Sequence, residues 1–532
     1  MEGLSNENIN SRVESSLHSD LDNEKVSLIN PYTRKEYPRD KKEFKQSLPY
    51  HQNPNFQYLD KIIETISFSK YHLATLLVCS FSIMCGGFVT THYIFSKNLL
   101  MKRYTWTLTE YSLIFIFQNI VGAVGAFISV TSTTNTWDIH SNILIGLVGL
   151  LSIILMTFYN DSPLYIILIM IFNYCHGFIN NICCNFLLEE FKFKYRELAF
   201  LLVNSLRLIG YLLFGIFESI IYDKYNNEDP IMSIVCLAVL QLGLVISLAF
   251  FYDSPRLLYY NSHYEQLYKY IEATTPTHDL SKYTSTIMKK IKSTRKELDT
   301  YFPSQKYEDF LKHFAQLWHG PYLILSLKAI IFVFLSTFLM SNIKDSYSYY
   351  LNDSSQYLFI IVDENAPHYK ICYYYICVFA GIIGIILIKY YLNLPRKLLS
   401  LISLAACFVF LILMILINKH FLYFLGVFEA FACFYYMMVY MYFSTYITTQ
   451  LRNSMTSLLY ITMSISYIFQ SALINSMKNY TLFGYLNFGV TIILAFLEAF
   501  VLGDDTKNLQ LQEIEITLLR ANSKYENEHE KI

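Results

Sequence analysis

Twelve apolar stretches, each about as long as a helix that crosses a bilayer, fill the chain from Tyr71 to Gly503. A bilayer core about 30 Å thick needs about 20 apolar residues per helix, and only helices or closed barrels satisfy their backbone groups in lipid. The stretches come as six, then a polar insert, then six more. This layout predicts an all-α membrane protein with twelve transmembrane helices in two six-helix halves.

The predicted boundaries follow the apolar stretches. The spans are 71–95, 107–131, 142–159, 163–188, 197–222 and 230–252, and then 321–341, 370–391, 398–417, 421–444, 453–476 and 482–502. The predicted parts are a flexible cytoplasmic tail over 1–70, the first half over 71–252, a cytoplasmic central loop over 253–319, the second half over 320–503 and a cytoplasmic tail over 504–532. Short surface helices are expected near 264–271, 284–298 and 509–519, because these polar segments have helical periodicity.

Composition excludes several functions. The chain is 54% hydrophobic and only 16% charged, whereas soluble domains carry about 25% charged residues. A net charge of -1 gives no electrostatic reason to bind nucleic acid. The ten cysteines all lie inside apolar stretches, which predicts buried thiols and no disulfide framework. No metal cluster, nucleophile–base pair or phosphate-binding glycine loop stands out, so we expect neither an enzyme nor a cofactor.

Orientation rests on glycosylation sequons, because lysines and arginines are spread over loops of both parities and the positive-inside rule does not decide. The three sequons begin at Asn160, Asn352 and Asn479. All three lie in outer loops if the tails and the central insert are cytoplasmic. Asn352 is the predicted acceptor, and the predicted location is a multi-pass protein of the plasma membrane or an endomembrane.

Two motifs at matching places in the six-plus-six frame point to a family. After the sixth stretch the chain reads Asp253-Ser254-Pro255-Arg256-Leu257-Leu258, and after the twelfth it reads Gly503-Asp504-Asp505-Thr506-Lys507-Asn508-Leu509. These segments resemble the Glu-Ser-Pro-Arg-Trp-Leu and Pro-Glu-Thr-Lys-Gly signatures of the major facilitator superfamily. The resemblance covers about residues 62–512 and is to its sugar porters, organic-ion transporters and synaptic-vesicle-protein-like members.

The resemblance also implies a set of gate residues at the inner ends of the helices. Glu189 and Arg196 have the spacing of the family's Glu–Arg pair after the fourth helix, and Arg452 starts an Arg-Asn pair at the symmetric place. Arg396 lies in a degraded Gly-Arg-Arg loop. The sequence departs from the family where the loop after the second stretch lacks its acid and arginines. Asn173 stands where the family has an arginine tied to proton coupling.

Polar residues inside the apolar stretches are the candidates for solute contact, because such groups are costly in lipid and usually face a cavity. Arg207 could bind an anionic solute, and Asn204 has the position of a substrate-binding amide in sugar porters. On the fourth stretch, Asn173 and His176 share a helical face with Asn180. The predicted solute-binding residues are Asn173, His176, Asn204, Arg207, Lys328 and Glu429. The alternative for each is a hydrogen bond or ion pair with a neighbouring helix, or a side chain that reaches the interface.

The predicted function is transport of a small polar organic solute, sugar-like or an organic ion, by alternating access, either facilitative or secondary active. The expected partners are that solute and the lipid bilayer, and a coupling ion is left open. The alternative is a non-transporting sensor or complex subunit on the same fold, since the gate motif after the second stretch and the coupling arginine are lost. Solute identity and flux direction do not follow from the fold.

Overall fold

The computed structural model describes residues 63, 68–130, 139–158, 161–225, 231–260, 263–274, 314–352, 367–392, 394–416, 421–447, 449–476 and 480–501. Most of the predicted tails, the predicted helices at 284–298 and 509–519 and the sequon residues Asn160 and Asn479 lie outside these ranges. Asn352 is the last residue of a helix, and the rest of its sequon lies outside the described residues.

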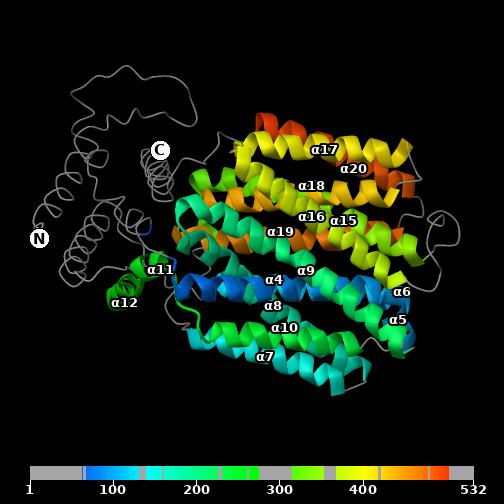
Figure 1. Ribbon diagram of the computed structural model, residues 1–532, viewed down its shortest axis with the longest axis horizontal. Helices are drawn as coiled ribbons and strands as arrows, with labels where there is room; N and C mark the ends of the chain where they lie inside the picture. Colours follow the sequence, from blue (N-terminus) through cyan, green and yellow to red (C-terminus); the bar gives the residue numbers. More distant parts are fainter. Residues whose placement is uncertain are drawn as a thin grey trace, which may run out of the picture.

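Six long helices form the first half of the molecule. They are α4 (Lys70–Phe95), α6 (Leu108–Ile128), α7 (Ile139–Phe158), α8 (Ser162–Glu190), α9 (Phe193–Tyr225) and α10 (Ile231–Leu248). The short α5 (Lys97–Tyr104) joins the first two of them. In Figure 1 this half occupies the lower part of the bundle, with α7 and α10 at its outer edge.

Six further long helices form the second half. They are α15 (Gly320–Asn352), α16 (Pro367–Leu392), α17 (Arg396–Leu416), α18 (Phe421–Thr445), α19 (Thr449–Ser476) and α20 (Tyr480–Phe500). They occupy the upper part of Figure 1, with α17 and α20 at the outer edge. The predicted all-α class is confirmed.

Nine of the described helices are long and apolar enough to cross a membrane. Two of the remaining predicted spans correspond to shorter apolar helices, Ser233–Leu248 and Leu486–Phe500. The third, α19, carries hydroxyl side chains such as Ser454, Thr456 and Thr462, which are fully or almost fully buried. Its polar side chains therefore face other helices rather than lipid, which explains why its sequence is less apolar than that of its neighbours.

The two halves meet along two helix pairs, α9 against α16 and α6 against α19. Within the first half, α6 and α8 touch backbone to backbone, because a Cβ built on Gly177 would lie 2.1 Å from the Gly122 carbonyl oxygen. Small residues at helix crossings are the usual means of close packing in membranes. This contact fixes α8, which carries many of the polar residues described below, against the helix that faces the second half.

One end of the bundle carries the connection between the halves, and we call it the connection end. Here α8 ends, α9 begins, and α10 leads into α11 (Pro255–Tyr260) and α12 (Tyr264–Thr274), seen at the left of Figure 1. The surface helix expected near 264–271 is α12, and its apolar side chains Leu267 and Ile271 are buried.

Candidate functional site

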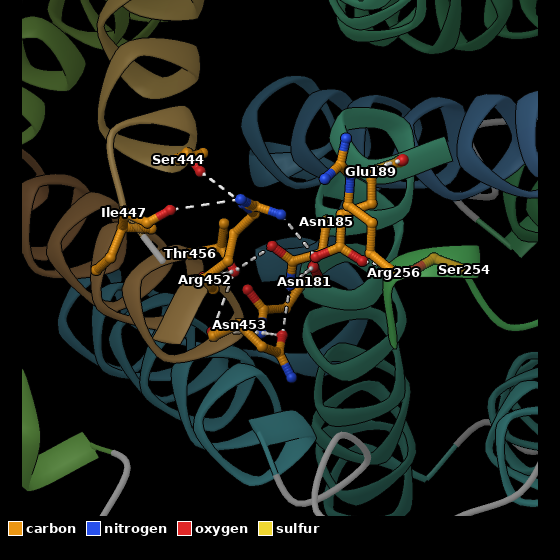
Figure 2. A network of polar contacts seen from close by, with 10 residues as sticks. All are labelled: Asn181, Asn185, Glu189, Ser254, Arg256, Ser444, Ile447, Arg452, Asn453 and Thr456. Atoms are coloured by element: carbon orange, nitrogen blue, oxygen red, sulfur yellow. Dashed lines mark hydrogen bonds and ion pairs between the residues drawn. The ribbon is translucent and has the colours of Figure 1, made fainter. Parts of the chain in front are cut away.

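A buried ion pair joins the two halves at the connection end. Arg452, in the first turn of α19, places its Nη1 atom 2.8 Å from the Oε1 atom of Glu189 at the end of α8. The side chains are 0% and 8% exposed, respectively. Figure 2 shows the pair at the centre of a wider polar network. An ion pair out of water needs further hydrogen bonds to offset its loss of hydration, and both partners have them.

The end of α18 supplies the further contacts of Arg452. Its guanidinium donates to the Ser444 carbonyl at 3.1 Å and to the Ile447 carbonyl at 3.4 Å. The last carbonyls of a helix lack intrahelical partners and carry partial negative charge, so a cation is stabilised there. Arg452 therefore binds the C-terminal end of α18 in its own half and a carboxylate of the other half at once.

The connection after α10 supplies the further contacts of Glu189. The Ser254 hydroxyl donates to the other carboxylate oxygen, and the Arg256 Nε atom donates to the Glu189 backbone carbonyl at 3.3 Å. Ser254 and Arg256 belong to the motif Asp253-Ser254-Pro255-Arg256-Leu257-Leu258, which continues into α11. Next to them, the Tyr270 hydroxyl on α12 donates to Glu190 at 3.0 Å. The motif thus holds the end of α8 in position for its pairing with Arg452.

A layer of amides continues this contact toward the centre of the molecule. The Asn453 Oδ1 atom accepts from Asn181 Nδ2 at 2.8 Å and from Asn185 Nδ2 at 2.6 Å. Its own Nδ2 atom donates to the Ser129 backbone carbonyl at 3.0 Å, and the Thr456 hydroxyl donates to the side-chain amide oxygen Oδ1 of Asn185 at 3.1 Å. These residues are all buried, and their hydrogen bonds join α6, α8 and α19 directly.

A second charged cluster lies between α9 and the second half. Glu197, in the first turn of α9, pairs with Lys389 near the end of α16 and with the Nε atom of Arg396 at the start of α17, at 3.3 Å for the latter. The three side chains are 15% exposed or less. Arg196, the residue before Glu197, is also buried at this end. The predicted gate residues are thus gathered at one end of the bundle, three of them in ion pairs between the halves.

Halfway along α8 and α9 lies a different group of polar residues. Asn173 and Asn204 each donate from Nδ2 to the carbonyl four residues earlier in their own helix, at 2.8 and 2.9 Å. His176 and Arg207 are half-buried beside them. These four residues, together with the buried Asn180, are called the central polar group below.

Tyrosines of both halves surround Arg207. The guanidinium interacts electrostatically with four phenol groups, which belong to Tyr211 of α9, Tyr436 of α18, and Tyr460 and Tyr467 of α19. The His176 imidazole also interacts electrostatically with the Arg207 guanidinium. The tyrosines of the second half therefore face the central polar group of the first half across the interface.

Two glycines of α4 bring His176 and Arg207 together. A Cβ on Gly86 would lie 2.5 Å from the His176 Nε2 atom, and one on Gly87 would lie 2.2 Å from the Arg207 carbonyl oxygen. A side chain at Gly87 would push the backbone of α9 away from α4, whereas one at Gly86 would displace the His176 imidazole. The Gly-Gly pair is thus a requirement of this arrangement, and it is visible in the sequence only as two adjacent small residues.

Of the two predicted solute-binding residues of the second half, Lys328 has a partner within its own half. Lys328 on α15 donates its ammonium to the Val501 carbonyl, directly after α20, at 3.0 Å. This is the stabilising position for a cation at a helix C-terminus. Glu429 on α18 is fully buried. Within the described ranges, no three His, Cys, Asp or Glu side chains are placed to hold a metal ion.

Several residues at the connection end are missing from the sequence prediction. Glu197 and Lys389 read as ordinary charges at helix ends, and Asn181 and Asn185 are one position away from the predicted polar face of α8. A search for polar residues at i and i+4 would have found the second face. Only the partners on α19, which are far away in the sequence, distinguish this face of α8 from a lipid-facing stripe.

Comparison with known proteins agrees with the fold. A model of the Major Facilitator Superfamily matches residues 76–471. A search of curated proteins returns no sequence match to this chain. Among solved structures, the proton:xylose symporter XylE bound to 6-bromo-6-deoxy-D-glucose is 13% identical with a TM-score of 0.63, covering 84% of this chain and 98% of that one.

Two further XylE structures are similar. The partially occluded inward-open conformation of the xylose transporter XylE from E. coli is 14% identical with a TM-score of 0.58, covering 81% of this chain and 100% of that one. A double Trp mutant of XylE is 15% identical with a TM-score of 0.64, covering 84% and 99%. The predicted family and its multi-pass membrane fold are confirmed. Because the family model matches most of its length, the chain belongs to the Major Facilitator Superfamily.

Proposed function

We propose that the protein carries a small polar organic solute across a membrane by alternating access of its two halves. The observation that supports this most strongly is the division of its buried polar residues into two sets. One set, around Glu189, Arg452 and Asn453, ties the halves together at the connection end. The other set, the central polar group, lies halfway along the helices between the halves.

The contacts at the connection end are suited to repeated opening. Charged and amide groups that separate into water regain hydrogen bonds from water, so their separation costs far less than that of an apolar interface of the same area. The central polar group lies too deep in a closed molecule for water to replace its hydrogen bonds. In this proposal the first set is a gate and the second set binds the solute.

The proposed solute contacts are Asn173, His176, Asn204 and Arg207, and the proposed gate consists of Glu189, Arg452, Asn453 and the Glu197 cluster. The connection end faces the cytoplasm if the predicted orientation holds, so the structure corresponds to a state with a closed inner gate. XylE is named as a proton:xylose symporter. By analogy, the first solutes to test here are sugar-like molecules and organic ions, and the first coupling ion to test is the proton.

Uptake by the purified protein in liposomes tests the proposal. We expect accumulation of at least one labelled solute from a panel of sugars, carboxylates, amino acids and organic cations. In a background without native cysteines, the variant Asn181→Cys/Asn453→Cys should lose uptake when a short reagent crosslinks the pair. Uptake should return after the crosslink is cleaved, and each single cysteine variant is the control.

The same experiment separates transport from the alternative. A folded protein that accumulates no solute of any class, and that co-purifies stably with another membrane protein, would instead support a sensor or a complex subunit. Uptake that continues unchanged in the crosslinked variant would show that the connection end does not open during the cycle.

A further inference from the structure

We infer that the solute carries an anionic group, a carboxylate or a phosphate, and that Arg207 binds it. This inference rests on the proposed transport function and adds the chemical class of the solute.

Most of the buried charges described above have partners within the chain. Arg452 pairs with Glu189, Glu197 pairs with Lys389 and Arg396, and Lys328 binds the end of α20. Arg207 differs from them. In the part of the chain that the structure describes, its guanidinium has no hydrogen bond to a protein acceptor and no ion pair.

The surroundings of Arg207 contain phenols where a counter-ion would be expected. Its electrostatic neighbours among the described residues are Tyr211, Tyr436, Tyr460 and Tyr467, and none of them is a carboxylate. A neutral phenol leaves the positive charge uncompensated, and a lone cation at membrane depth is costly. A solute with a carboxylate or phosphate would supply the missing charge, and the planar guanidinium fork matches both groups with two parallel hydrogen bonds.

The remaining polar atoms of this region suit the rest of such a solute. In the described structure, His176 Nδ1 and Asn180 Oδ1 are buried without a hydrogen-bond partner. A neutral imidazole nitrogen and an amide oxygen can accept from hydroxyl groups of a solute, and phenols can both donate and accept. The geometry therefore favours a small hydroxylated acid or a phosphorylated molecule over a neutral sugar.

The position of Arg207 also links binding to movement of the halves. Arg207 belongs to the first half, whereas Tyr436, Tyr460 and Tyr467 belong to the second. An anion that neutralises Arg207 removes the penalty for enclosing that charge between the halves. Binding would thus favour the occluded state, which is what alternating access requires of a solute.

The test is thermal stabilisation and liposome uptake with defined probes. The probes are lactate and succinate as carboxylates, inorganic phosphate and glycerol 3-phosphate as phosphates, D-xylose and D-glucose as neutral sugars, and choline as a cation. We expect stabilisation and uptake with at least one anion and none with the sugars or choline. The carboxylate and phosphate arms identify which oxyanion is accepted.

Variants at position 207 assign the effect to the guanidinium. Arg207→Gln should weaken binding of the effective anion roughly 10- to 100-fold, because a hydrogen bond to a charged group is lost. Arg207→Lys keeps the charge but not the planar fork and should give an intermediate loss. Lys269→Gln, an exposed charge on α12, is the matched control and should bind like the unmodified protein.

The outcomes separate this inference from the transport proposal. Uptake of a neutral sugar or choline that is unchanged in Arg207→Gln would overturn the anionic solute and leave transport standing. Anion uptake that does not depend on Arg207 would overturn the assignment of the site. Absence of binding and uptake for every probe, with a folded protein by size exclusion and thermal unfolding, would count against both.

Discussion

A single asparagine makes much of the contact between the halves at the connection end. The amide of Asn453 accepts from two asparagines of α8 and donates to the backbone of Ser129 at the end of α6. The family's loop after the second helix carries an acid and arginines, which this chain lacks. The contact between the halves at the connection end therefore combines these neutral amides with the ion pairs of Glu189 and Glu197.

At the residue scale, Arg452→Ala should lower the free energy of unfolding by about 3–5 kcal/mol, because Glu189 would be left as a buried charge without its cation. The double variant Arg452→Ala/Glu189→Gln should lose less than the sum of the single variants. Thermal unfolding of the four proteins in one detergent measures this coupling. Strictly additive losses would mean that the two side chains do not depend on each other.

Residue types were easier to predict from the sequence than partners. The resemblance to family motifs at the inner ends of the helices predicts Glu189, Arg396 and Arg452 as gate residues. Their partners could not be predicted, because the pairs join segments that lie far apart in the chain, as Glu189 and Arg452 do. Lys328 shows the same limit, since its acceptor at Val501 is the end of a helix in the last part of the chain.

At the element scale, the crossing of α4 and α9 depends on glycine. We expect Gly87→Ala to destabilise the protein by about 1–3 kcal/mol, because the new methyl group would meet the Arg207 carbonyl at 2.2 Å and force the helices apart. It should also weaken solute binding by displacing Arg207. Thermal unfolding and the binding assay measure the two effects separately.

A matched control exists on another helix. A Cβ on Gly384 of α16 would meet nothing within 4 Å, so Gly384→Ala should be neutral or stabilise by up to about 1 kcal/mol through helix propensity. Equal effects of the two substitutions would contradict the close approach of α4 and α9. The sequence could place both glycines on helices, but only the packing of α4 against α9 tells the two positions apart.

The contact between α12 and the end of α8 is also expected to contribute to stability. Burial raises the pKa of the Tyr270 phenol, and the adjacent Glu190 carboxylate raises it further, so the hydroxyl stays protonated and donates to that carboxylate. Tyr270→Phe should cost about 1–3 kcal/mol, because a buried carboxylate loses a donor. Tyr268→Phe on the same helix is the control, and thermal unfolding is the measurement. A loss no larger than that of the control would mean that α12 does not support the end of α8.

At the scale of the whole molecule, the two halves were predictable and their relative position was not. Apolar length and the motif after the sixth stretch were enough for the fold class and the family. Where the halves touch at the connection end depends on side chains such as Glu197 and Asn181 that face the other half. A sequence pattern gives the face of each helix but not the helix opposite it, so these contacts required the three-dimensional structure.

The Glu197 cluster gives the last prediction, and it concerns the movement of the halves. Glu197→Lys would place three cations together where one carboxylate now meets Lys389 and Arg396, so like-charge repulsion should favour separation at the connection end. Separation of the halves at this end would let all three cations reach water, so the shift should be a change in population rather than unfolding. Labelling of a cysteine introduced at Asn453 should become faster. The reciprocal variant Glu197→Lys/Lys389→Glu/Arg396→Glu restores attraction and should return the labelling rate toward its original value. Equal labelling rates in all three proteins would mean that this cluster does not hold the halves together.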